Sequence, residues 1–162
     1  PGRGRRVPGS LTDDADVRAP YPDYAARVRA SFDAQPLMRT LGAVLTAVEP
    51  GVVRIELPFS AALTQQHGYV HAGAITSIVD SACGYAAYSL MPAGAEVLTV
   101  EFKVNLLNPA QGERFVAVGR VIKPGRTLTV CQGEVTALAG NEHRTVALMQ
   151  TTMMQIGAWN HE

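Results

Sequence analysis

A single carboxylate, Asp80, lies in the middle of a segment that is otherwise made almost entirely of small and apolar residues. Residues 72–90 contain no Lys or Arg, so Asp80 has no cation at the neighbouring helical positions. An unpaired carboxylate is costly to bury, and Asp is a poor residue for a helix interior. A catalytic role for Asp80 explains both features. The alternative is a carboxylate that caps a buried polar group and does no chemistry.

The rest of the chain predicts strands and turns around this helix. A short helix is expected over residues 21–33, and a turn or short 3₁₀ segment over residues 36–42. Apolar patterns and turn residues predict six strands, over residues 43–48, 52–57, 98–106, 115–122, 127–135 and 144–154. Antiparallel strands with one apolar face must cover something, and the 72–90 helix is the only sizeable covering element. The predicted fold class is therefore α+β, with a curved six-stranded antiparallel sheet around one long central helix.

The strand at residues 98–106 has the clearest pattern. Apolar and polar residues alternate without a break, which is typical of a strand packed on one side. The apolar set, expected to face the core, is Leu98, Val100, Phe102, Val104 and Leu106. The polar set is Thr99, Glu101, Lys103 and Asn105.

Composition limits the classes of partner. The 14 basic and 14 acidic residues give zero formal net charge, which argues against nucleic acid or an anionic membrane as a partner. No apolar run is long enough to span a membrane, and we expect a cytoplasmic protein. A single domain is predicted over residues 21–158, after an Arg-, Gly- and Pro-rich tail over residues 1–20 that is expected to be disordered or foreign to the domain.

Several other chemistries are disfavoured. Cys83 and Cys131 lie in apolar segments and are predicted to be small buried hydrophobes, and Cys83 has no base beside it. His67 and His71 are four residues apart, but the segment between them does not look helical, so no metal site is predicted. The chain has no Gly-x-Ser-x-Gly motif of a serine hydrolase.

Five segments, in this order along the chain, resemble hotdog-fold acyl-CoA thioesterases of the phenylacetate-degradation type. They are Gln65-Gln66-His67-Gly68, His71-Ala72-Gly73 followed by Asp80, residues 98–103, Asn108-Pro109-Ala110 and Gly125-Arg126-Thr127. The resemblance covers residues 40–155. It implies the hotdog fold and hydrolysis of an acyl-CoA to free acid and CoA, with no cofactor beyond the CoA of the substrate. It does not specify the acyl group.

The resemblance also implies roles for individual residues. Asp80 is expected to be the catalytic carboxylate, either as nucleophile or as general base. The backbone N–H of Ala72, with that of Gly73, is expected to polarise the thioester carbonyl, although Ala72 replaces the usual first Gly of the motif. The residues expected to assist are Gln65 near the water or carbonyl, His71 at the thioester end, and Thr99 near the water. For Gln65 and Thr99, an ordinary loop or strand residue is the alternative.

Helix geometry adds a constraint on these roles. The first N–H groups of a helix are unpaired and lie at the positive end of its dipole, so they suit a developing oxyanion. His71 and Asp80 are roughly 13 Å apart on one helix. They cannot flank one carbonyl within a subunit, so a second subunit must supply the missing half. A homodimer is therefore the minimum, and a homotetramer is compatible with the sequence.

Four cations gather in a short stretch that ends in a Pro-Gly turn: Arg114, Arg120, Lys123 and Arg126. The family implies that Arg120, Lys123, Gly125 and Arg126 contact the phosphates of CoA, a role that suits the planar donor fork of Arg. A solvated surface is the alternative.

Two rival functions also stay open: a hotdog hydratase or dehydratase acting on acyl thioesters, and a non-catalytic acyl-CoA binding module.

Overall fold

The computed structural model describes residues 18–157. Its helices are α1 (Tyr24–Ala34), α2 (Pro36–Leu41), the short 3₁₀ helix η1 (Ala61–Leu63) and α3 (Ala72–Tyr88). Its strands are β1 (Val44–Glu49), β2 (Val52–Pro58), β3 (Glu96–Leu106), β4 (Arg114–Lys123), β5 (Leu128–Ala139) and β6 (Glu142–Ile156). Most of the predicted tail, residues 1–17, and the last residue of the predicted domain, 158, lie outside the described residues.

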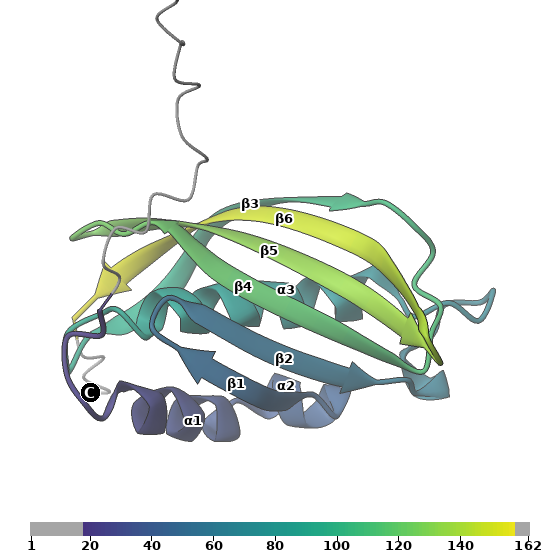
Figure 1. The fold of residues 1–162 in the computed structure, drawn as a ribbon, viewed down its shortest axis with the longest axis horizontal. Helices are drawn as coiled ribbons and strands as arrows, with labels where there is room; N and C mark the ends of the chain where they lie inside the picture. Colours follow the sequence, from purple (N-terminus) through teal and green to yellow (C-terminus); the bar gives the residue numbers. More distant parts are fainter. Residues whose placement is uncertain (1–17, 158–162) are drawn as a thin grey trace, which may run out of the picture.

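The strands form one sheet that curves over α3. Its order is β1-β2-β4-β5-β6-β3, and every neighbouring pair is antiparallel. Helix α3 lies against the concave face, and α1 and α2 run along the β1 edge (Figure 1). The predicted α+β hotdog fold is confirmed.

Two paired glycines allow α3 to lie close to the sheet. Gly119 on β4 and Gly133 on β5 are register partners. A Cβ on Gly119 would lie 2.3 Å from the backbone carbon of Ala82, and one on Gly133 would lie 2.4 Å from a methyl of Val79. The small residues expected on the helix therefore face glycines on the sheet. The backbones of α3 and the sheet approach more closely than packed side chains would permit.

The prediction for the faces of β3 was wrong in part. The pairing of β3 with β6 shifts between Thr99 and Glu101, so Val100 is an extra residue in a β-bulge. A bulge breaks the strict alternation of side chains. Thr99 consequently shares the inner face with α3, whereas Leu98 and Val100 remain 44% and 52% exposed. Beyond the bulge, Phe102 and Leu106 are also exposed because nothing in the described chain covers this end of the edge strand.

The other predicted elements are present with shifted ends. Helix α3 ends two residues earlier than expected, with Ser89 as its C-cap. Residues 36–41 form a short α-helix in place of a turn or 3₁₀ segment. Pro36 occupies its first turn, where a missing N–H costs nothing, and Gly42 ends it in the left-handed region with a φ of 75°. The β5–β6 hairpin is longer than predicted and turns at residues 140–141.

Arg27 attaches α1 to the end of α3. Its guanidinium donates hydrogen bonds to the carbonyls of Tyr88, Met91 and Pro92, at 2.8, 3.1 and 2.7 Å. It also stacks on the Tyr88 ring, with 3.9 Å between the guanidinium carbon and the ring centroid. Tyr88 is the last residue of α3, and Met91 and Pro92 belong to the turn that follows it. The contacts of Arg27 fix α1 beside the end of α3.

Candidate active site

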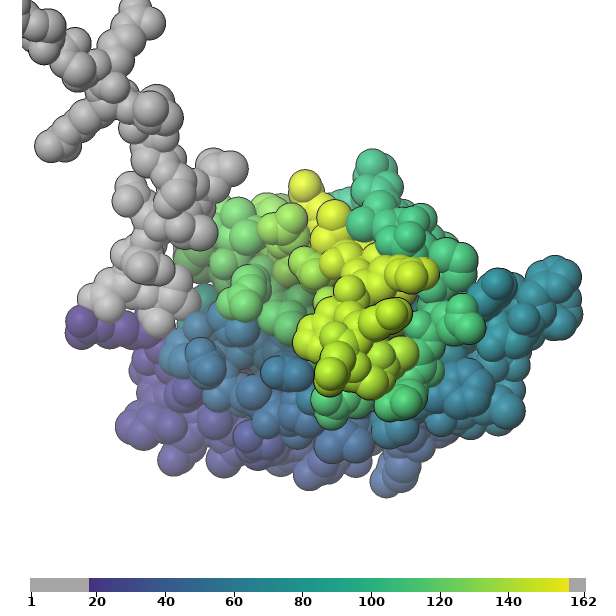
Figure 2. Space-filling model, turned by 45° about the vertical axis from the view of Figure 1, so that its right-hand side comes forward, coloured from purple at the N-terminus to yellow at the C-terminus, as the bar shows by residue number. Residues whose placement is uncertain are grey.

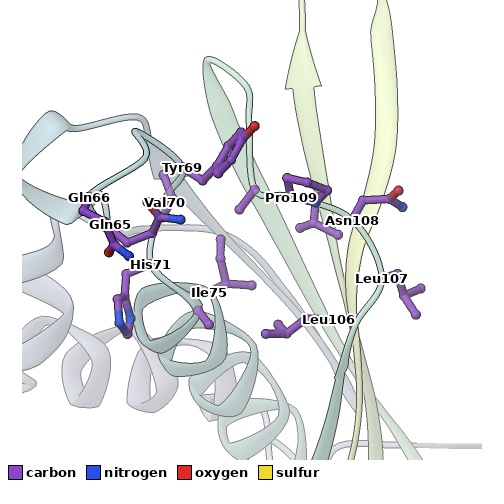
Figure 3. A pocket seen from close by; sticks show the side chains of 13 residues that line it. Gln65, Gln66, Tyr69, Val70, His71, Ile75, Leu106, Leu107, Asn108 and Pro109 are labelled. Carbon is purple, nitrogen blue, oxygen red and sulfur yellow. The ribbon is translucent and has the colours of Figure 1, made fainter.

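The start of α3 opens onto a cavity of about 510 Å³. Its walls come from the loop before α3, the first turn of α3 and the segment that follows β3 (Figure 3). The predicted residues Gln65, His71 and Ala72 line it together with apolar side chains such as Ile75 and Leu106. The loop before α3 projects from the body of the molecule at the right-hand side of the space-filling view (Figure 2).

His71 is the N-cap of α3. Its Nδ1 accepts a hydrogen bond from the backbone N–H of Gly73 at 2.8 Å. A side chain on Gly73 would crowd the ring, because its Cβ would lie 3.0 Å from Nδ1. His71 therefore takes up one of the two backbone donors predicted for the thioester carbonyl. The N–H of Ala72 has no acceptor among the described residues and stays available.

Gln65 is held by the loop in a way that frees its amide NH₂. Its backbone bonds to Tyr69 and Gly68, and its Oε1 accepts the N–H of His67. Gly68, with a φ of 85°, supplies the left-handed residue of this tight turn. Since the amide oxygen is occupied, the Nε2 group remains as a donor toward the cavity that Gln65 lines.

Asp80 and Thr99 line a second cavity, of about 320 Å³, farther along α3. The Thr99 hydroxyl donates a hydrogen bond to Asp80 Oδ1 at 3.0 Å. It also lies 3.5 Å from Met153 Sδ, but a hydroxyl has one proton and a thioether is a weak acceptor. The β3 bulge is what turns Thr99 toward the carboxylate.

The surroundings of Asp80 favour its protonated carboxyl more than water does. Burial raises the pKa of the Asp80 carboxyl, and the hydrogen bond from Thr99 opposes that effect by lowering it. Lys and Arg are absent from the residues that line this cavity. A carboxyl of raised pKa in a cavity is a candidate base or nucleophile with a physical reason for its reactivity.

The two groups of predicted residues do not meet within one chain. Ala72 and Asp80 lie eight residues apart on α3, which is about 12 Å along the helix. Their cavities share no lining residue. One chain thus has a half-site with backbone and amide donors, and a separate half-site with a carboxylate and a hydroxyl.

The residues predicted to contact CoA line neither cavity. Arg120 lies on the outer face of the sheet, because its neighbour Gly119 faces α3. Lys123 and Arg126 are exposed. A glycine is required at position 125 for a local structural reason, since a Cβ there would lie 2.1 Å from the carbonyl oxygen of Leu128. Their role toward CoA stays a prediction.

Cysteine and metal chemistry find little support in the described residues. Cys83 and Cys131 are both buried, as predicted, and burial raises the pKa of both thiols, that of Cys131 to about 12. Among residues 18–157, no three His, Cys, Asp or Glu side chains gather closely enough to hold a metal ion. Within the same range, no helix combines the length and apolarity needed to cross a membrane.

Comparisons with known proteins place the chain in a family. The Thioesterase superfamily profile matches residues 67–142, which include His71, Asp80 and Thr99. A Halobacterium salinarum protein named "Putative esterase" is 30% identical over 122 residues, or 72% of this chain and 80% of that protein. The chain belongs to the thioesterase superfamily. The resemblance inferred from the five sequence segments is thereby confirmed.

Solved structures of similar proteins agree with the fold. A thioesterase family protein from Silicibacter pomeroyi is 53% identical, with a TM-score of 0.82 over 83% of this chain and 99% of that chain. The E. coli PaaI protein from the phenylacetic acid degradation operon has a TM-score of 0.76 over 84% of this chain and 95% of that chain. At 20% identity, that second likeness shows the fold alone.

Sequence reasoning missed part of the second cavity. Ser31 reaches it from α1, Gln35 from the junction between α1 and α2, and Glu96 from the start of β3. None of the three belongs to a motif, and Ser31 lies 54 residues from the Tyr85 hydroxyl that it meets. The one signal in the sequence is the pair Val28 and Phe32, four residues apart in the expected 21–33 helix, which indicates that one side of this helix packs against the core.

Proposed function

We propose that this thioesterase-superfamily protein is an acyl-CoA thioesterase whose active sites form between two copies of the chain. Each site takes Gln65, His71 and Ala72 from one copy and Asp80 with Thr99 from the other. The observation that carries the proposal is the separation of these residues into two cavities along one helix. Neither cavity alone has both an oxyanion donor and a carboxylate.

The two edges of the sheet support this assembly. The β1 edge is accompanied by α1 and α2, whereas β3 forms the opposite edge and nothing in the described chain pairs with it (Figure 1). An edge strand of 11 residues presents a row of unpaired N–H and C=O groups. On its inner face, Phe102 is 45% exposed and Leu106 is 53% exposed. Such a long apolar edge is suited to pairing with another strand.

A two-fold dimer that pairs through β3 brings the half-site of Ala72 in one copy beside the half-site of Asp80 in the other. Two copies that pair through β3 about a two-fold axis run antiparallel, so each residue faces one at the mirrored position. Pairing centred near the middle of β3 puts the Leu106 end of one copy beside the Thr99 end of the other. Leu106 lines the cavity of Ala72, and Thr99 lines the cavity of Asp80. The two halves therefore face each other.

The chemistry is hydrolysis of a thioester. The Ala72 N–H and the Gln65 amide hold the carbonyl oxygen as it gains negative charge. Asp80 of the other copy acts as general base on water or attacks the carbonyl carbon itself, and Thr99 orients the carboxylate or the water. The C–S bond breaks, the thiol of CoA leaves with a proton, and an oxygen from water ends in the free acid.

Thiol release from a panel of short, medium, long and aryl acyl-CoA esters tests the proposal, with Asp80→Asn beside the parent. Turnover that falls by at least about 100-fold in the variant, at unchanged oligomeric state, supports it. A folded parent that binds acyl-CoA without turning over any ester contradicts it and leaves a binding module.

A further inference from the structure

The cavity that Asp80 lines runs along α3 and β3, from Asp80 toward Glu96. Asp80 contacts Thr99 at one end, and Tyr88 Oη lies 3.5 Å from Glu96 Oε1 farther along the same two elements. Helix α3 and strand β3 therefore run in opposite directions past each other. From Asp80 to Tyr85 is about 7.5 Å along the helix, and from Thr99 to Glu96 is about 10 Å along the strand. An acyl tail that starts at Asp80 extends toward Tyr85 and Glu96.

The far end of this cavity is polar. The hydroxyls of Ser31 and Tyr85 lie 3.4 Å apart, and Glu96 contributes a carboxylate. Gln35 also lines the cavity, and its buried Oε1 has no hydrogen-bond partner among the described residues. This amide oxygen is therefore an acceptor suited to a donor on the ligand. The rest of the lining carries no charge and consists of Ala34, Ser81, Gly84, Val97 and Met153.

We propose that this cavity binds the acyl tail and selects tails of about six carbons that end in an uncharged hydrogen-bond donor, such as a hydroxyl. The selection is made by Glu96 together with Ser31, Gln35 and Tyr85. This inference rests on the proposed thioesterase function and names the substrate class of the same site.

The length of the acyl tail and the charge at its end decide which tails the cavity selects. An extended chain advances about 1.2 Å per bond, so six bonds from the carbonyl carbon reach about 7 Å, which is close to the rise along α3 from Asp80 to Tyr85. A terminal hydroxyl there donates to the Glu96 carboxylate, and a hydrogen bond to a charged group is among the stronger kinds. A tail that ends in a carboxylate meets Glu96 as a like charge and is rejected.

Three esters of equal length test the assignment: hexanoyl-CoA, 6-hydroxyhexanoyl-CoA and adipoyl-CoA. For the parent, kcat/KM is expected to be at least about tenfold higher for the hydroxyl ester than for hexanoyl-CoA, and lowest for adipoyl-CoA. In Glu96→Gln the ratio of adipoyl-CoA to hexanoyl-CoA rises by about tenfold or more, since the like charge is gone. Ratios within one preparation cancel differences in the amount of folded enzyme.

Glu134→Gln is the matched control. Glu134 lies on β5, away from the β3 edge and outside both cavities, and accepts hydrogen bonds from Thr136 and Thr145, so its replacement leaves all three ratios unchanged. Equal kcat/KM for the three esters in the parent, or identical ratios in parent and Glu96→Gln, overturns the assignment while hexanoyl-CoA turnover still supports the thioesterase. A parent that hydrolyses none of the three overturns the proposed function and this inference with it.

Discussion

The Thr99 hydroxyl donates a 3.0 Å hydrogen bond to Asp80 Oδ1, from the edge strand to the central helix. This bond lowers the pKa of the Asp80 carboxyl, against the larger effect of burial. In Thr99→Val the carboxyl pKa rises further, so the acid limb of the kcat/KM profile moves to higher pH. Activity at neutral pH falls by roughly tenfold or more, because a hydrogen bond to a charged group is lost.

Thr99→Ser keeps the hydroxyl and serves as the control for this pH profile. Its acid limb is expected to coincide with that of the parent. If the Val and Ser variants have the same pH profile, Thr99 acts on something other than the protonation of Asp80.

Asp80 itself is expected to lower the stability of the fold. Its carboxyl pKa is raised in the folded state relative to the unfolded state, so the folded state binds the proton more tightly. Stability therefore falls as pH rises from the unfolded pKa to the folded pKa, and stays lower above it. Asp80→Asn removes that cost, so the variant is expected to be inactive yet more stable than the parent at pH 7.

Thermal unfolding of parent and Asp80→Asn at several pH values measures this effect. The two transition temperatures should converge as the pH is lowered below the folded pKa of Asp80. A variant less stable than the parent at neutral pH would mean that the carboxylate makes favourable contacts in the folded state that outweigh burial.

The backbone donor of Ala72 is open to a direct test by Ala72→Pro. Proline has no N–H, and the first position of a helix is where it fits best. The preceding residue, His71, already has the extended conformation that a following proline requires, with a φ of −61° and a ψ of 139°. We expect kcat to fall by about 100- to 1,000-fold at unchanged stability, as for other oxyanion donors.

Ala72→Ser adds only a hydroxyl and keeps the backbone N–H, and it should retain most of the activity. Full activity of Ala72→Pro would exclude this N–H as the oxyanion donor. The oxyanion donor would then be Gln65, whose Nε2 is the other available donor near the same cavity.

Arg27 is expected to be the main attachment of α1. Arg27→Met loses three hydrogen bonds from a charged donor and a cation–π contact. The expected loss of unfolding free energy is about 2–4 kcal/mol. Chemical denaturation measures it, with Arg29→Met, an exposed residue of the same helix, as the control. Equal stabilities of the two variants would show that α1 is held by its apolar contacts instead.

The sequence predicted those parts of the fold that depend on local patterns. The 72–90 helix was evident because a long run of small and apolar residues ends at a Pro and a Gly. Asp80 was evident because one charge interrupts that run. The prediction that the site is divided between two chains followed from helix geometry, since a rise of about 1.5 Å per residue separates Ala72 from Asp80 whatever surrounds them.

Features that depend on distant contacts could not be predicted in this way. The unbroken alternation of residues 98–106 predicts a regular strand, and nothing in it marks Val100 as the bulged residue. The bulge reflects pairing with β6, some 50 residues later. The polar end of the second cavity likewise depends on Ser31 and Tyr85 meeting across 54 residues of sequence. Gly73 was predicted to be an oxyanion donor, but its N–H donates to Nδ1 of His71, the residue that caps the helix.

A heterodimer of two inactive variants tests the shared site most directly. Asp80→Asn and Ala72→Pro, coexpressed with different tags and purified through both, give dimers in which one site carries both changes and the other carries neither. If sites are shared, the heterodimer recovers about half of the parental activity per dimer, because one of two symmetric sites is intact. A heterodimer as inactive as its two components would contradict the shared site, since each site would then lie within one chain.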